Sequence, residues 1–135
     1  MLLDLELRLR PDAQSPAEAR KTLEAMRVSL DEEVVDDAAL LVSEIVSNSV
    51  RHAGLVATDA IEVRIRGSRS MLHVDVIDPG PGFELERTRW PSREGGWGLW
   101  LLDRLATRWG VERGDVTRVW FDLASPVSAS VAAGT

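Results

Sequence analysis

The sequence contains no cysteine, and only one of its sixteen basic residues is a lysine. Without cysteine the chain can form neither a disulfide framework nor a thiolate-ligated zinc site, which fits a reducing compartment. The single lysine, Lys21, does not follow a glycine, so a Walker-type phosphate loop with its Gly-Lys-Ser/Thr is excluded. Any phosphate-binding chemistry must therefore use other groups.

Long apolar runs and an excess of positive charge are absent as well. The N-terminal residues alternate leucines with charged residues and lack the basic start and apolar run of a signal peptide. No run of about eighteen apolar residues, the length that a membrane span needs, occurs anywhere. The net charge of −6 argues against a nucleic-acid surface, which needs a basic patch. We expect a cytoplasmic protein that binds neither nucleic acid nor membrane.

The 135 residues are enough for one domain with its own core, because 44% of them are hydrophobic and 28% are charged. We predict a single domain over residues 1–124. The small and polar residues that follow predict a disordered tail over residues 125–135.

Hydrophobic periodicity gives the first two elements. Leucines alternate with charged residues from the start of the chain to residue 9, which predicts a half-buried strand. Ser15 and Glu18 have the spacing of a capping box, with Pro16 at the first helical position, and an apolar stripe follows. We therefore predict a helix over residues 16–30.

A second helix should begin after Asp36 or Asp37, either of which can cap it, and end near Gly54. Alternating apolar residues at 61–66 and 71–77, separated by a turn-like segment, then predict an antiparallel hairpin.

The remainder of the chain is less regular. Residues 79–96 combine prolines, glycines and charges without a period and predict a long functional loop. A helical pattern over residues 99–108 follows, then a short strand at 111–113 and a last strand over 118–123.

Glu44 and Asn48 stand four residues apart in the second predicted helix, so both project from one face, and His52 continues the row. Such a pair is often part of a solvated face. The flanking sequence is strongly apolar, however, unlike that of a solvated helix. A carboxylate here can accept a proton, and an amide oxygen is a hard ligand suited to Mg²⁺ held jointly with phosphates.

A glycine-punctuated run begins with Asp78 at the end of a predicted strand and continues through Gly80 and Gly82. It can be read as a rigid surface turn. Alternatively, it forms the floor of a pocket in which the backbone approaches a flat ligand and the carboxylate accepts its amino hydrogen bond. An adenine amino group would suit such a floor.

A second glycine cluster, containing Gly96 and Gly98, leads through Leu99 into a helix. Bare amides at a helix start can hold phosphate oxygens. The dinucleotide fingerprint is excluded, because no strand directly precedes the cluster and no third glycine follows at the required spacing.

These three motifs, in this order, resemble the N, G1 and G2 boxes of the GHKL ATP-binding fold. Within that fold the chain resembles the bacterial anti-sigma factor serine/threonine kinases, over about residues 1–124. The resemblance implies an α+β, two-layer sandwich with a mixed, mainly antiparallel sheet covered on one face by helices. ATP would lie between the helices and a lid.

The resemblance also implies roles for individual residues. Glu44 would be the general base, Asn48 the Mg²⁺ ligand and Asp78 the adenine reader. Backbone at the remaining positions would hinge the lid or wrap the phosphates: Gly80, Gly82, Gly96, Gly98 and Leu99. The arginine of the first helix that helps to dock the protein substrate would be Arg20.

Other positions near these motifs receive no catalytic role. His52 is expected to pack or to form a hydrogen bond, and the lid arginines Arg87, Arg89 and Arg93 are expected to be solvated. Relatives commonly place a threonine directly before the Val-Trp pair of the last strand, whereas this chain has an arginine there. Thr117 lies one residue earlier, on the opposite face of the strand, so the resemblance supplies no phosphate contact for it.

The resemblance implies an ATP-dependent serine/threonine kinase that phosphorylates an anti-sigma factor antagonist. A sigma factor is a second partner that it suggests, and a homodimer is the assembly that it suggests. The alternative is a nucleotide-gated binding module without kinase activity. A fragment of a sensor histidine kinase is disfavoured, since no helical hairpin comes before the first strand.

Overall fold

The computed structural model describes residues 3–52, 54–80 and 97–125. They form a five-stranded sheet in the order β1-β2-β3-β5-β4. Every pairing between neighbouring described strands is antiparallel, so the sheet is not mixed in this part of the chain. The strands are β1 (Leu3–Leu9), β2 (Ile61–Ser68), β3 (Met71–Asp78), β4 (Arg108–Arg113) and β5 (Thr117–Ala124).

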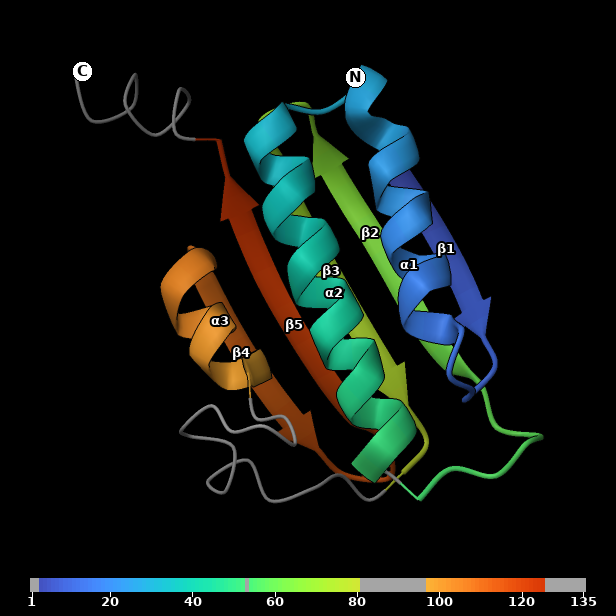
Figure 1. Cartoon of the computed structure of the whole chain (residues 1–135). Helices are drawn as coiled ribbons and strands as arrows, with labels where there is room; N and C mark the ends of the chain where they lie inside the picture. The colour runs from blue at the N-terminus through green and yellow to red at the C-terminus, as the bar shows by residue number, and fades with distance from the viewer. Residues whose placement is uncertain (1–2, 53, 81–96, 126–135) are drawn as a thin grey trace.

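The helices lie on one face of this sheet (Figure 1). They are α1 (Ser15–Glu24), the short 3-10 helix η1 (Ala25–Val28), α2 (Glu32–His52) and α3 (Trp97–Leu105). α2 runs across the middle, with α1 on the side of β1 and α3 on the side of β4 (Figure 1). The predicted two-layer α/β sandwich is therefore confirmed. No described helix combines the length and the apolar character that crossing a bilayer requires.

The core lies between the helices and the sheet, and the sequence pattern explains its place. In β2, Ile61, Val63 and Ile65 are fully buried while the residues between them face the other side of the sheet. α2 presents buried aliphatic residues along most of its length, at helical spacing: Val34, Val35, Ala38, Leu41, Val42, Ile45 and Val46. Two amphipathic layers thus bury their apolar faces against each other.

Both N-terminal helices begin earlier than the sequence predicted. Ser15 does not cap α1: it lies inside the first turn, and its hydroxyl turns back to the Arg10 carbonyl and to Asp12. α2 begins at Glu32, one turn before the predicted aspartate cap, because Val34 and Val35 bury their side chains in the core. Packing against neighbouring elements has overridden the local capping signals.

The C-terminal part differs in the same way. α3 ends at Leu105 and β4 already begins at Arg108, where the sequence pattern predicted continued helix. β4 pairs with β5 over six residues, so pairing extends a strand that the sequence marked only weakly. At Gly110 a Cβ atom would lie 2.6 Å from Nε1 of Trp120, so the indole occupies the space beside this glycine.

The sheet face away from the helices is polar. At its centre lies Asp75, which is only 3% exposed. Its carboxylate oxygens form ion pairs with a guanidinium nitrogen of Arg118 at 2.5 Å and with one of Arg66 at 3.4 Å. His73 lies between two carboxylates, with Nδ1 2.6 Å from Asp122 and Nε2 3.2 Å from Asp75. The charges on this face are therefore largely paired across the strands.

Candidate nucleotide site

The C-terminal half of α2 places Glu44 and Asn48 one helical turn apart on one face. Asn48 is 4% exposed, and Glu44 is half-buried. The Asn48 carbonyl oxygen, Oδ1, is buried and has no hydrogen-bond partner among the described residues. A buried amide oxygen without a partner costs free energy, which a cation or a ligand donor at this position would recover.

Asp78 lies at the end of β3 and is 3% exposed. Its two carboxylate oxygens accept separate hydrogen bonds: Oδ2 from the Ser49 hydroxyl at 2.7 Å and Oδ1 from the Gly80 N–H at 2.9 Å. The first bond joins α2 to β3, and the second fixes the chain where it leaves the strand. Ser49, the residue next to Asn48, thus ties the Asp78 carboxylate to α2.

A fourth residue completes this network. Thr117, the first residue of β5, is buried and lies directly opposite Asp78 in the sheet register. Its hydroxyl donates to the Gly80 carbonyl at 3.1 Å. Gly80 is therefore held through both of its backbone polar groups, at the point where the predicted lid begins.

Sequence reasoning did not assign Ser49 or Thr117 to the site. The burial of Thr117 follows the alternation of β5, in which every second residue from 117 faces the helices. That alternation was the available signal, since it placed Thr117 on the face opposite Arg118. Ser49 gave no comparable signal, because only the tertiary contact between α2 and β3 shows what its hydroxyl reaches.

The second glycine motif is only partly described. Gly98 is the second residue of α3, so its backbone N–H belongs to the first turn, where helix amides have no partner within the helix. Leu99 is half-buried and packs against the core, and α3 as a whole packs against α2. Gly82 and Gly96 lie outside the described residues, as do Arg87, Arg89 and Arg93.

The remaining predicted positions are Arg20 and His52. Arg20 is exposed on α1, which lies on the opposite side of α2 from α3 (Figure 1). It is thus on the helical surface and not beside Asp78. His52 is the last residue of α2, and nothing is described of its side chain.

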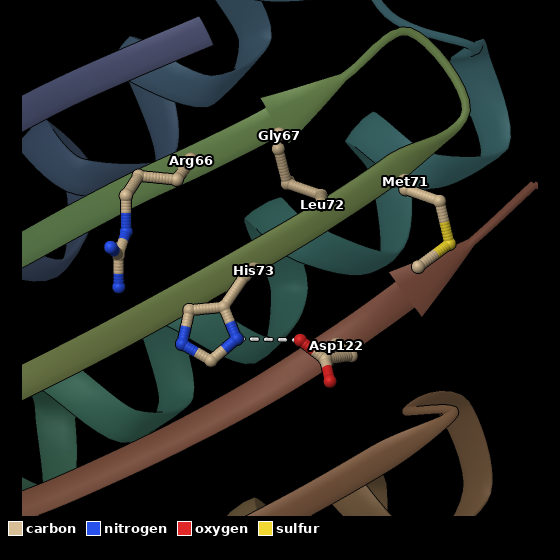
Figure 2. Close-up of a pocket in the computed structure, with 6 residues that line it drawn as sticks. All are labelled: Arg66, Gly67, Met71, Leu72, His73 and Asp122. Carbon is tan, nitrogen blue, oxygen red and sulfur yellow. Dashed lines mark hydrogen bonds and ion pairs between the residues drawn. The ribbon is translucent and has the colours of Figure 1, made fainter. Parts of the chain in front are cut away.

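A different hollow, of about 330 Å³, lies on the sheet face away from the helices. Figure 2 shows it beside the β2–β3 hairpin, with the His73 ring directed at Asp122. Arg66 and Met71 border it as well. Its lining within the described part of the chain includes none of the predicted site residues. The chemistry of the three motifs points instead to the helix-side end of β3, where Asp78 lies.

Comparison with protein families gives one clear result. The histidine kinase-like ATPase domain family matches residues 9–122, which is most of the chain. The protein therefore belongs to this family, and the resemblance drawn from the three motifs is confirmed. Membership in an ATPase domain family implies that the chain binds ATP. A comparison with proteins of curated function finds no significant match.

Solved structures agree on the fold. The RsbU and RsbW domains of Rv1364c from Mycobacterium tuberculosis are 18% identical, with a TM-score of 0.66, and the match covers 91% of this chain and 33% of that one. The histidine kinase domain of a blue-light activated histidine kinase from Erythrobacter litoralis is 21% identical, with a TM-score of 0.58 and coverage of 87% and 64%. This chain therefore spans a third of the first structure and just under two thirds of the second.

Proposed function

We propose that this protein is an ATP-dependent serine/threonine protein kinase and that its substrate is an anti-sigma factor antagonist. The observation that carries the proposal is the buried, unpartnered Oδ1 of Asn48, one helical turn from the half-buried carboxylate of Glu44. Membership in the histidine kinase-like ATPase domain family supports ATP as the bound nucleotide. The resemblance to anti-sigma factor kinases supplies the substrate class, with a sigma factor as a second candidate partner.

The residues fit Mg²⁺ as the cofactor. A hard amide oxygen without a partner among the described residues suits a cation that takes one or two protein ligands and fills its remaining positions with water and nucleotide phosphates. In this proposal Asn48 would hold the ion. When bound, the ion would neutralise charge on the transferring phosphoryl group.

The other residues position the reactants. Asp78 keeps lone pairs for the adenine amino group even though each of its oxygens already accepts one bond, because a carboxylate offers about four acceptor sites. The first amides of α3, including that of Gly98, would face the phosphates. Glu44 would accept the proton of the attacking serine or threonine hydroxyl.

The decisive experiment measures phosphate transfer from γ-labelled ATP and Mg²⁺ to an antagonist protein that co-purifies with the chain from its native host. We expect labelled phosphoserine or phosphothreonine, which survives acid, whereas the phosphohistidine of a sensor kinase would not. Transfer to no protein, with ATP binding intact, would refute the kinase proposal and leave a nucleotide-gated binding module.

Two variants then separate chemistry from binding. Glu44→Gln keeps the size of the side chain, so we expect unchanged Mg²⁺-ATP affinity and a turnover that is lower by a factor of about 10² to 10⁴, the usual contribution of a general base. Asn48→Ala should abolish Mg²⁺-dependent binding itself. Equal loss of affinity in both variants would mean that Glu44 is structural.

A further inference from the structure

The hollow beside the β2–β3 hairpin is separate from the nucleotide site and has the size of a small-ligand site. Its volume of about 330 Å³ falls at the lower end of the range of about 300–1,000 Å³ that such sites occupy. Met71, which borders it, is the first residue of β3, whereas Asp78 is the last. At the rise of an extended strand these two residues are about 23 Å apart. A small ligand in the hollow would therefore not contact the nucleotide.

One border of the hollow is apolar. Met71 is 47% exposed, one of the few large hydrophobic residues that the described part of the chain leaves uncovered. Beside it lie Gly67 and Leu72, which are paired with each other across β2 and β3. A thioether side chain is flexible and polarisable, so it can adapt its contact to an apolar group. A ligand with an apolar body would cover part of this exposed methionine.

Arg66 supplies a cation at the hollow and has hydrogen-bonding capacity to spare. In the described part of the chain its guanidinium contacts one carboxylate, that of Asp75, at 3.4 Å. Asp75 has a closer partner in Arg118 at 2.5 Å, so Arg66 is not needed to compensate its charge. A guanidinium carries five N–H donors, and the Arg66 side chain is 46% exposed. Most of these donors are therefore available to a ligand.

The acidic residue at the hollow, in contrast, is already paired. An oxygen of Asp122 lies 2.6 Å from Nδ1 of His73, as Figure 2 shows, and the other lies 3.5 Å from Nε of Arg108. Nε2 of His73 is in turn 3.2 Å from Asp75. Both ring nitrogens and both Asp122 oxygens thus have partners within the sheet. The least compensated charge at the hollow is that of Arg66, which favours an anionic ligand.

The shape of the guanidinium and its apolar neighbour together define the class of ligand. Parallel N–H groups of an arginine form paired hydrogen bonds with the two oxygens of a carboxylate. We propose that the hollow binds a small carboxylate with a short apolar body, whose oxygens pair with Arg66 and whose apolar body packs on Met71. This site is independent of the proposed kinase activity, because none of its residues belongs to the nucleotide site.

Methionine methyl signals in NMR spectra report binding at the hollow directly. The chain has three methionines, of which Met71 borders the hollow and Met26 is buried in the core. In the full chain with isotope-labelled methionine methyl groups, sodium isovalerate should shift the Met71 signal saturably, with a dissociation constant in the millimolar range, and leave Met26 in place. Isovaleramide has the same shape without the charge, and acetate has the charge without the apolar body. Both should bind at least about fivefold more weakly at the same ionic strength.

Two arginines of β2 provide a matched pair of variants. Arg64 and Arg66 lie on the same face of the strand, with side chains 45% and 46% exposed, but of the two only Arg66 borders the hollow. Arg66→Gln should weaken isovalerate binding at least about tenfold, whereas Arg64→Gln should leave it unchanged. Arg66→Lys keeps the charge but loses the paired geometry, so its affinity should be intermediate.

A saturable shift of the Met71 signal that requires both the carboxylate and Arg66 supports the proposal. Absence of a saturable shift overturns it, and so does equal binding of isovaleramide or undiminished binding by the Arg66→Gln variant. Acetate binding as strong as that of isovalerate overturns the contact with Met71. The comparison of the three probes uses the unmodified protein, so it decides the matter even where a variant fails to fold, which thermal unfolding of each variant detects.

Discussion

At the scale of single residues, the site combines one buried polar group that has hydrogen-bond partners with one that lacks them. Both oxygens of Asp78 have protein partners, whereas the carbonyl oxygen of Asn48 has none among the described residues. An unsatisfied buried group costs about 1–3 kcal/mol, so Asn48 carries a penalty that a bound ligand would remove. Asp78, in contrast, holds the site together before any ligand arrives.

Asp78→Asn should weaken both the fold and adenine recognition. An amide offers one oxygen acceptor in place of two, so either the Ser49 hydroxyl or the Gly80 N–H loses its acceptor. We expect a loss of about 1–3 kcal/mol in the free energy of unfolding, measured by urea denaturation, and at least tenfold weaker ATP binding by calorimetry.

Ser49→Ala is the matched control, because it removes one hydrogen bond to Asp78 but keeps the carboxylate. It should cost stability while retaining the preference for ATP over GTP. If Asp78→Asn left that preference and the ATP affinity unchanged, Asp78 would not read the adenine.

At the scale of elements, the N-terminal part of α2 concentrates negative charge. Its first turns carry an acidic group that includes Glu33, Asp36 and Asp37. Asp36 is paired, 2.6 Å from Arg27 of η1. For Asp37, partial burial and then the neighbouring Asp36 and Glu33 raise the pKa of its carboxyl above the ordinary value of 3.8.

Because the pKa of Asp37 is raised in the folded state, the stability of the fold depends on pH. The folded state binds the Asp37 proton more tightly than the unfolded state, so stability falls as pH rises from 3.8 through the raised pKa. Above that window the charge destabilises the fold. Asp37→Asn should therefore raise the melting temperature at pH 7 by about 1–3 °C, and this gain should disappear below pH 3.8.

Asp36→Asn provides the comparison at the next position. It removes the ion pair with Arg27 and at the same time relieves part of the repulsion on Asp37, so its gain at pH 7 should be smaller than that of Asp37→Asn or negative. Melting curves of both variants at several pH values make the test. A gain from Asp37→Asn that persisted at low pH would contradict the electrostatic cause.

At the scale of the whole molecule, three elements from distant parts of the chain meet at one end of the sandwich. The end of α2, the end of β3 and the start of β5 are joined by the bonds among Ser49, Asp78, Gly80 and Thr117. A nucleotide bound there would contact the helical layer and the sheet together. Binding should therefore stabilise the fold as a unit.

Mg²⁺-ATP should raise the melting temperature in proportion to the logarithm of its concentration. At a hundred times the dissociation constant the stabilisation should be about 2.7 kcal/mol, or roughly 5–10 °C for a domain of this size. Differential scanning fluorimetry with ATP, with and without Mg²⁺, measures this shift.

Asn48→Ala should remove the Mg²⁺-dependent part of that shift, since it deletes the proposed ligand oxygen. Arg20→Ala, on the exposed surface of α1, is the control and should leave the shift unchanged. A full Mg²⁺-dependent shift in the Asn48 variant would show that the ion is held by other groups.

Much of this structure could be predicted locally, because its signals are periodic. The alternation in β1, β2 and β3 and the apolar stripe of α2 follow directly from the geometry of a strand and a helix. Boundaries failed where a neighbour decided them. α2 starts early because Val34 and Val35 are buried, and β4 is extended by its pairing with β5.

The three motifs were enough to predict the family and the two-layer class, and spacing along a helix or strand predicted which side chains share a face. Tertiary structure decided which of these groups are partnered. Ser49 and Thr117 entered the site only because α2 and β5 pack beside the end of β3. The Asn48 oxygen is distinguished only by its burial. Alternation along β5 indicates which of its residues are buried, but the hydrogen-bond partner of a buried group lies in a chain segment far away in sequence, so no local pattern contains it.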